Sequence, residues 1–170
     1  AAAYKAPIAA EPNVLNATIH QGKKLSYNNL VDADGALDCV KEFDEPACVV
    51  VKHANPCGVA TGEDITDCFH CAFNADSLSA FGGIVALNRT CTTDIAEALR
   101  KIFIEIVLAP EFEAGALELF AKKKNLRVLE IGQLGSREPR LEYKYVDGGL
   151  LVQEINVKTI VLDDLTTVTK

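Results

Sequence analysis

The chain has 170 residues, of which 49% are hydrophobic and 24% charged, and its formal net charge at pH 7 is −7. This length and balance suit one soluble globular domain with an adequate core. The acidic charge, without a basic stripe, argues against nucleic-acid binding, and no apolar run approaches the roughly 20 residues that a membrane span needs.

The start of the chain and its cysteines indicate the cellular compartment of the protein. The opening AAAYKAPIAAEP lacks the apolar core of a signal peptide. The chain contains no methionine, so we expect a processed, excised or incomplete piece. Its six cysteines lie mostly within apolar patterns, which is typical of reduced, buried thiols. We therefore expect a cytoplasmic protein.

After a loose, proline-containing start, the chain shows helix and strand patterns in alternation. The stretch 26–43 carries apolar residues at helical spacing, and Asn29 or Asp32 is predicted to cap it. The run 47–51 is continuous and β-branched, which is typical of a strand buried on both faces. The stretch 64–75 has the clearest helical pattern.

The alternation continues to the end of the chain. The remaining predicted elements are a strand at 84–87, a helix at 92–103 capped by Thr92 or Thr93, a strand at 104–110, a helix at 112–124, a strand at 126–132, and two edge strands around a turn within 141–155. This order predicts a three-layer α/β fold with a largely parallel sheet and helices on both faces. The basic run Lys122–Lys124 is interpreted as a solvated helix end.

Two patterns resemble metal sites. Cys68 and Cys71 form a C-x-x-C pair, but Cys68 belongs to the apolar helix stripe and no second pair follows at zinc-finger spacing. The stretch from His53 to Cys57 is similar to the zinc-deaminase signature H-x-E followed by P-C-x-x-C. Asn55 replaces the required glutamate, and an alanine stands where the last cysteine would be. We expect no metal site.

The stretch VVVKHANPCG places Lys52 and His53 directly after the buried run 47–51. Ligands of open α/β sheets bind at the carboxyl ends of strands, and the following NPCGVATG is interpreted as a turn-rich loop whose amides could approach an anion. A histidine can accept a proton at neutral pH, and an adjacent lysine favours its neutral form and can stabilise an oxyanion. The alternative is that both side chains merely end a strand.

Two further stretches are open to two interpretations. Ser79-Ala80-Phe81-Gly82-Gly83 either allows close backbone approach to a ligand or is a plain turn before a strand. The polar stretch 26–29 either donates amides to a ligand or only caps the helix.

Taken together, these stretches resemble a known family. In this order, the chain contains GKKLSYNNLVDADGAL, VVVKHANPCGVATG, SLSAFGGIVALNR, FIEIVLAPEF, AKKKNLRVLEIGQ and GGLLVQE. They are similar to the first half of the transformylase domain of the bifunctional purine-biosynthesis family that couples AICAR (aminoimidazole carboxamide ribonucleotide) transformylase to IMP cyclohydrolase. The resemblance implies two cytidine-deaminase-like α/β halves. It covers the first half over residues 20–170, after a loose segment 1–19.

The resemblance also implies a reaction and a site. The reaction is formyl transfer from 10-formyltetrahydrofolate, as co-substrate, to the 5-amino group of AICAR, without a metal. Lys52 and His53 match the catalytic pair of the family, with His53 as general base and Lys52 as its orienting, charge-stabilising partner. The expected substrate-binding residues are Asn28, Asn29, Asn55, Pro56, Ser79, Phe81, Gly82 and Glu105.

The chain departs from the family pattern in what it lacks. The family segments R-Y-G-E-N-P-H-Q, S-N-A-I-V and H-F-R-H are absent, as are the second half and the cyclohydrolase domain. Family sites form between halves and across a homodimer, so we expect this chain alone to be weakly active or inactive. Two alternatives stay open: a non-catalytic nucleotide- or folate-binding module, and a zinc-dependent deaminase.

Overall fold

The computed structural model describes residues 2–5, 12–135, 138–158 and 165–169. Parts of the predicted loose segment 1–19 and of the predicted domain 20–170 therefore lie outside the described residues. The chain divides into two compact units, Ala1–Gly135 and Ser136–Lys170.

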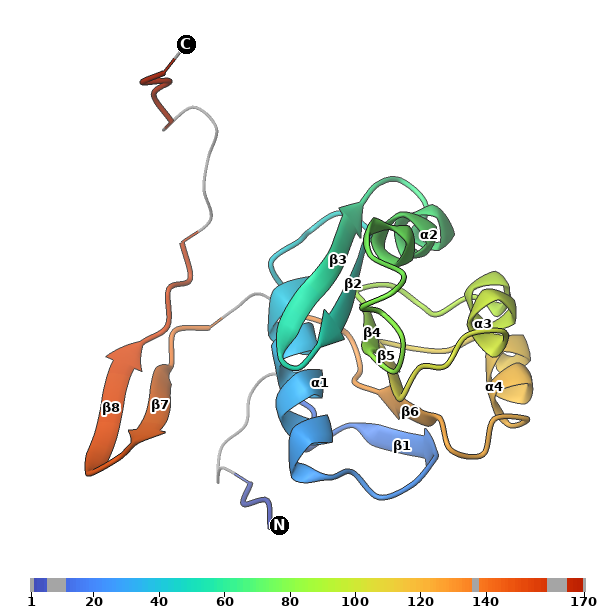
Figure 1. Cartoon of the computed structure of the whole chain (residues 1–170), viewed down its shortest axis with the longest axis horizontal. Helices are drawn as coiled ribbons and strands as arrows, with labels where there is room; N and C mark the ends of the chain where they lie inside the picture. The colour runs from blue at the N-terminus through green and yellow to red at the C-terminus, as the bar shows by residue number, and fades with distance from the viewer. Residues whose placement is uncertain (1, 6–11, 136–137, 159–164, 170) are drawn as a thin grey trace. The chain divides into compact units, whose positions relative to one another are not determined.

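The first unit is built on a six-stranded sheet with the order β1-β6-β5-β4-β2-β3 (Figure 1). Its elements are, in chain order, β1 (Thr18–Gln21), α1 (Tyr27–Val40), β2 (Ala47–Lys52), β3 (Asn55–Thr61), α2 (Ile65–Ala75), β4 (Ile84–Leu87), α3 (Thr93–Arg100), β5 (Ile106–Ala109), α4 (Ala114–Phe120) and β6 (Arg127–Glu130).

The sheet is mixed, so the prediction of a largely parallel sheet is wrong. Only β4, β5 and β6 run parallel to one another. β2 pairs antiparallel with both β3 and β4, and β1 pairs antiparallel with β6. The physical reason is the connection after β2: a two-residue turn can join antiparallel strands, whereas parallel strands need a long crossover.

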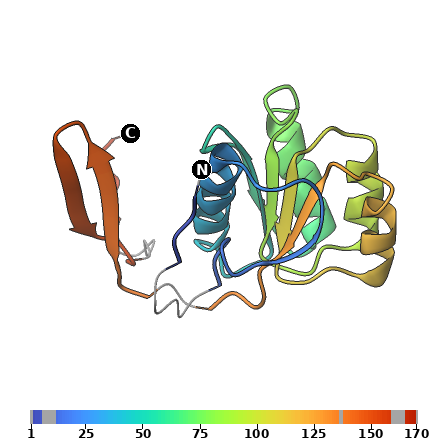
Figure 2. The same ribbon diagram turned by 90° about the horizontal axis from the view of Figure 1, so that it is seen from below.

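Helices flank the sheet on both faces (Figure 2). Helix α1 covers one face, where Leu37 and Val40 pack with sheet residues such as Val49 and Leu108. Helices α2, α3 and α4 cover the other face. Their buried side chains, including Phe69 and Phe120, form a second core cluster with that face of the sheet. Because both faces are covered, every residue of the predicted buried run 47–51 is buried.

Helices α1, α2 and α3 begin at side chains that accept hydrogen bonds from their first turns, whereas α4 begins at Glu113 without such a bond. Asp64 caps α2 and Thr92 caps α3, and the latter was one of the two predicted alternatives. Helix α1 is capped by Ser26, so the prediction of Asn29 or Asp32 as its cap is wrong. Asn29 instead completes a capping box: Ser26 N–H donates to its Oδ1, and its own N–H donates to Ser26 Oγ.

Two strands of the sheet were not predicted. β1 lies at one edge, and its first residues belong to the segment expected to be loose. β3 lies at the other edge and occupies the stretch interpreted as an anion-binding loop, so that interpretation is wrong: most of NPCGVATG pairs with β2. Gly58 of β3 is buried because the backbone of α2 approaches it; a Cβ there would lie 1.9 Å from the carbonyl oxygen of Ala72.

The second unit contains a hairpin of β7 (Leu141–Val146) and β8 (Gly149–Glu154). This confirms the strands predicted within 141–155.

Within the described part of the chain, no helix has the length and apolar character needed to cross a membrane.

Candidate active site at one edge of the sheet

The predicted site residues gather where several strands of the sheet begin or end. Val51, Ile84, Ile106 and Arg127 pair in one row across β2, β4, β5 and β6. Lys52 directly follows this row on β2, and Glu105 directly precedes it on β5. The site therefore lies at the carboxyl end of β2, as expected, but at the amino ends of β4, β5 and β6, because β2 runs in the opposite direction.

The turn between β2 and β3 carries the histidine of the predicted pair. Lys52 pairs with Asn55, so His53 and Ala54 form a two-residue turn, with φ values of 52° and 59°. Positive φ at both central residues is the geometry of a type I′ turn, which favours Asn-Gly. For residues with a Cβ this conformation costs roughly 1–2 kcal/mol each. The turn exposes the His53 side chain to solvent, where a substrate can reach it.

Two hydrogen bonds hold this turn. The side-chain amide of Asn55 donates to the carbonyl oxygen of His53 at 2.8 Å. The backbone N–H of Ala54 donates to Oδ1 of Asp32, on helix α1, also at 2.8 Å. From the sequence, Asp32 was predicted only as a possible helix cap, because a carboxylate 22 positions from the turn carries no local signal for this contact.

The lysine of the pair is fixed by backbone carbonyl groups. Nζ of Lys52 donates to the carbonyl oxygens of Phe81 and Gly82 at 2.9 and 3.0 Å. Gly82 has φ +68°, and a Cβ there would lie 3.1 Å from both Lys52 Nζ and the ring of Phe103. The position therefore requires glycine for its backbone conformation and for the space that Lys52 occupies.

A second pair of predicted residues is in contact beside the first. The side-chain amide of Asn29, which is 5% exposed, donates to Oε2 of Glu105 at 2.8 Å. Arg127 lies 3.6 Å from the same carboxylate oxygen. The backbone N–H of Glu105 donates to the carbonyl oxygen of Gly83 at 3.0 Å, which links this pair to the Lys52 loop.

The other predicted residues are placed less centrally. Ser79 donates to Asp76 from both its N–H and its hydroxyl, so its side chain is engaged in a local turn. Phe81 is 63% exposed, with its ring 5.2 Å from that of Phe103. Asn28 is exposed in the first turn of α1, and Pro56 is part of β3.

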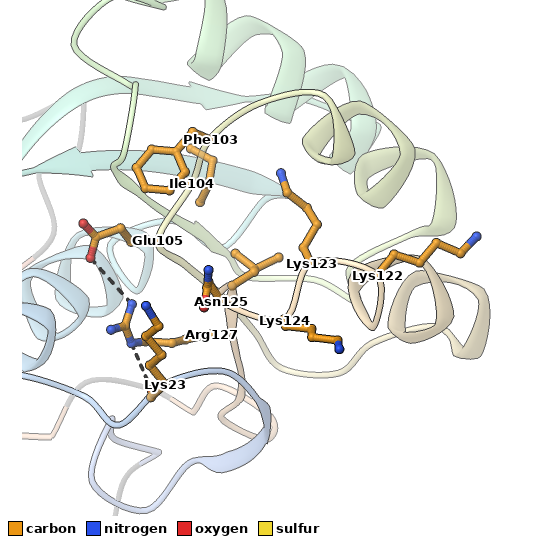
Figure 3. A pocket seen from close by; sticks show the side chains of 10 residues that line it. Lys23, Phe103, Ile104, Glu105, Lys122, Lys123, Lys124, Asn125 and Arg127 are labelled. Atoms are coloured by element: carbon orange, nitrogen blue, oxygen red, sulfur yellow. Dashed lines mark hydrogen bonds and ion pairs between the residues drawn. The ribbon is translucent and has the colours of Figure 1, made fainter.

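Beside Glu105 opens a pocket of about 610 Å³ that the sequence analysis did not predict (Figure 3). It is lined by Lys23, Phe103, Ile104, Glu105, Lys122, Lys123, Lys124, Asn125, Leu126 and Arg127. Five of these residues are cationic and only Glu105 is anionic, in a chain whose net charge is −7. The pocket thus favours an anionic group.

The lysines of this pocket are not simply a solvated helix end, as the sequence analysis held. Helix α4 ends at Phe120, and the lysines follow in the turn toward β6. Lys123 donates to the carbonyl oxygens of Leu99 and Ile102 at the end of α3, and its burial lowers its pKa. Arg127 donates from Nε to the carbonyl oxygen of Lys23 at 3.1 Å (Figure 3).

The other two histidines and the C-x-x-C pair lie elsewhere. His20 is in β1 and contacts Glu130 at 2.9 Å. His70 is exposed on α2. Cys68 is buried, and this burial raises its pKa, whereas Cys71 is exposed. Among the residues that the structure describes, no group of three or more His, Cys, Asp or Glu side chains could hold a metal ion.

Comparison with known proteins gives one match over the whole chain. The family model described as AICARFT/IMPCHase bienzyme matches residues 1–170. Among solved structures, the chain is similar to two forms of RibD from Acinetobacter baumannii, each with 14% sequence identity and a TM-score of 0.40. These similarities cover 49% and 51% of this chain, and 28% of each RibD chain.

Proposed function

The chain belongs to the AICARFT/IMPCHase bienzyme family, and on that premise we propose that it carries the Lys-His pair of a formyltransferase of purine biosynthesis. The proposed reaction moves the formyl group of 10-formyltetrahydrofolate to the 5-amino group of AICAR. The observation that carries the proposal is the arrangement of His53 on an exposed turn beside a lysine that two backbone carbonyls hold in place. We also propose that the first unit is a cytidine-deaminase-like half of the transformylase domain, that the intact protein is a homodimer, and that IMP cyclohydrolase belongs to another part of the protein.

The chemistry requires a base at the attacking nitrogen. An aromatic amine conjugated to a carboxamide is a weak nucleophile, so His53 accepts its proton as the nitrogen bonds to the formyl carbon. The bond from the formyl carbon to the folate nitrogen then breaks, and that nitrogen leaves with a proton. General-base catalysis of this kind is commonly worth about 10²–10⁴-fold in rate.

Lys52 supports this step by charge and position. An ammonium group has three N–H donors, and in Lys52 two of them bind Phe81 and Gly82. The third N–H can donate to the formyl oxygen as negative charge develops there. Because the lysine is already oriented, little reorganisation accompanies the reaction.

The surroundings suit the proposed substrates. Glu105 offers a carboxylate group of the kind that binds ribose hydroxyls, and the buried Asn29 orients it. Both AICAR and the folate are anions, and the basic pocket adjoins Glu105. We propose that the nucleotide or the folate lies along this edge of the sheet, from His53 toward that pocket.

The test is a formyl-transfer assay on the full-length protein that contains this chain, which follows tetrahydrofolate release with AICAR. His53→Ala should lower kcat at least about a hundredfold with AICAR still bound. His70→Ala, which removes an exposed histidine from α2, is the matched control and should leave kcat within about twofold of wild type.

Two other results would favour the alternatives. A wild-type protein that binds AICAR or folate without formyl transfer would be a binding module, and its affinity would fall in parallel at many loop residues. A wild-type protein that retains stoichiometric zinc after chelation and releases ammonia from a base would be a deaminase.

A further inference from the structure

The turn that carries His53 is held in an unfavourable backbone conformation by a residue on another element. His53 and Ala54 both have positive φ, a region that histidine adopts more often than most residues but that is uncommon for alanine. Backbone strain of this kind persists only where the surrounding structure enforces it, and it is concentrated at functional sites. We therefore looked for the contacts that hold this turn in its conformation.

Helix α1 supplies the contact. The N–H of Ala54 donates to Oδ1 of Asp32 at 2.8 Å. One turn further along the helix, Gly35 faces the same residue, since a Cβ built on it would lie 3.6 Å from the carbonyl oxygen of Ala54. Helix and turn thus meet at two points on one side of α1. A carboxylate that accepts from a backbone N–H makes a stronger bond than a neutral acceptor does.

The strand after the turn adds a second constraint. The pairing of β2 with β3 shifts between Val50 and Val51, so that Gly58 faces Val50 and Pro56 faces Val51. Cys57 is the extra residue of this bulge. Bulges near active sites change the direction in which a side chain points. The bulge, the tight turn and the bond to Asp32 lie within a few residues of His53.

We propose that Asp32 is a positioning residue: by accepting the N–H of Ala54 it holds the turn in its left-handed conformation and so fixes where the His53 imidazole is presented. This inference rests on the proposed function, because it assigns Asp32 a part in the step that His53 performs. Asp32 acts through the turn and does not touch the substrate.

The test compares variants in the full-length protein, by formyl transfer and by amide exchange. Asp32→Ala should lower kcat about ten- to a hundredfold while KM for AICAR and for the folate stays within about twofold, because the base is displaced whereas Asn29, Glu105 and the basic pocket are not. Asp32→Asn keeps an acceptor oxygen and should retain most of the activity. Adding Ala54→Gly to Asp32→Ala should restore kcat at least about fivefold, since glycine adopts positive φ without a Cβ penalty.

Hydrogen exchange at the Ala54 amide, measured in ¹⁵N-alanine-labelled protein, is a second readout that does not require formyl transfer. The amide should exchange about tenfold faster in Asp32→Ala than in wild type or Asp32→Asn. Asp67→Ala, which removes an exposed aspartate from α2, is the matched control and should change neither exchange nor kcat.

Each contrary result has a distinct meaning. Unchanged kcat in Asp32→Ala, or equal loss in Asp32→Ala and in the double variant with Ala54→Gly, would overturn the inference while formyl transfer by the wild type stands. An Ala54 amide that exchanges at the same rate with and without Asp32 would overturn it too. Absence of formyl transfer in the wild type would instead refute the proposed function, whatever the exchange data show.

Discussion

The side-chain amide of Asn29 donates a 2.8 Å hydrogen bond to the carboxylate of Glu105, across 76 positions of the sequence. The same Asn29 accepts from the N–H of Ser26 in the capping box of α1. One side chain thus fixes the start of the helix and orients a carboxylate that borders the basic pocket. Because the two contacts use different atoms of the amide, substitutions can separate them.

Asn29→Asp should weaken nucleotide binding without loss of the helix. The aspartate keeps the oxygen that caps α1, and a negative charge near a helix N-terminus is favourable. It also brings two carboxylates to hydrogen-bond distance, and their repulsion should displace Glu105. We expect the Kd for AICAR, measured by calorimetry, to rise about tenfold. Adding Glu105→Gln removes the repulsion and should recover part of the affinity; equal affinity in wild type and Asn29→Asp would contradict this role of the pair.

Gly82→Ala should impair both stability and catalysis. The new Cβ would meet Lys52 Nζ at 3.1 Å and would sit on a residue with φ +68°. We expect kcat/KM to fall at least about tenfold because Lys52 must move, and the free energy of unfolding to fall by about 1–2 kcal/mol. Gly132→Ala is the matched control, since Gly132 has φ +78° but nothing within 4 Å of the Cβ position. It should show the loss of stability alone.

Gly58→Ala should destabilise the first unit through a collision of backbones. Its Cβ would lie 1.9 Å from the carbonyl oxygen of Ala72, so α2 would have to move away from β3. Overpacking of this kind costs about 1–3 kcal/mol and sometimes more, and here we expect the upper part of that range in urea unfolding. At Gly62, near the same helix, a Cβ would lie 3.4 Å from the sulfur of Cys68, so Gly62→Ala should cost less than about 1 kcal/mol. Equal losses at the two glycines would contradict this assignment.

Thr93→Val should raise the pKa of Glu113. In the native protein the hydroxyl and the backbone N–H of Thr93 both donate to the Glu113 carboxylate. These hydrogen bonds lower the pKa of Glu113, and the bond from the hydroxyl is the larger cause. A carboxyl group whose pKa is lower in the folded state stabilises the fold at pH values above its unfolded-state pKa. This contribution is lost as the pH falls through the folded-state pKa. The variant should therefore be less stable than wild type at pH 7, and the difference should shrink below the unfolded glutamate value of about 4.3. Carbon-detected NMR titration and urea unfolding at pH 7 and 3 measure both effects; an unchanged Glu113 titration would contradict them.

Local patterns in the sequence were sufficient for most elements of the first unit. The helical spacing of α2 selects five residues, of which Ile65, Cys68, Phe69 and Ala72 are buried and Phe73 is partly buried. The run at β2 is buried on both faces, and Thr92 caps α3. These features depend on periodicity and on side chains within four positions of one another, so a short stretch of sequence contains the information.

The candidate site could be predicted from the sequence only in part. The resemblance selected Lys52, Gly82, Asn29 and Glu105, which the structure brings into two contacting pairs. It did not select the basic pocket, because the lining comes from three separate segments of the chain, namely Lys23, residues 103–105 and residues 122–127. Their proximity depends on the order of the strands, which no local pattern encodes.

The sequence by itself determined where the helices and most of the strands form, although not β1 and β3, because helical and strand spacing acts over a few residues. Only the tertiary structure decided that NPCGVATG pairs as a strand, with Gly58 there for the close approach of α2 and not for a turn. It also decided that β2 runs against β4, which places Lys52 beside Gly82, and that Asp32 meets the turn of His53. The contacts of Asp32 with Ala54 and of Lys52 with Gly82 join residues 22 and 30 positions apart, and they form only when register and strand direction are set by the packing of the whole sheet.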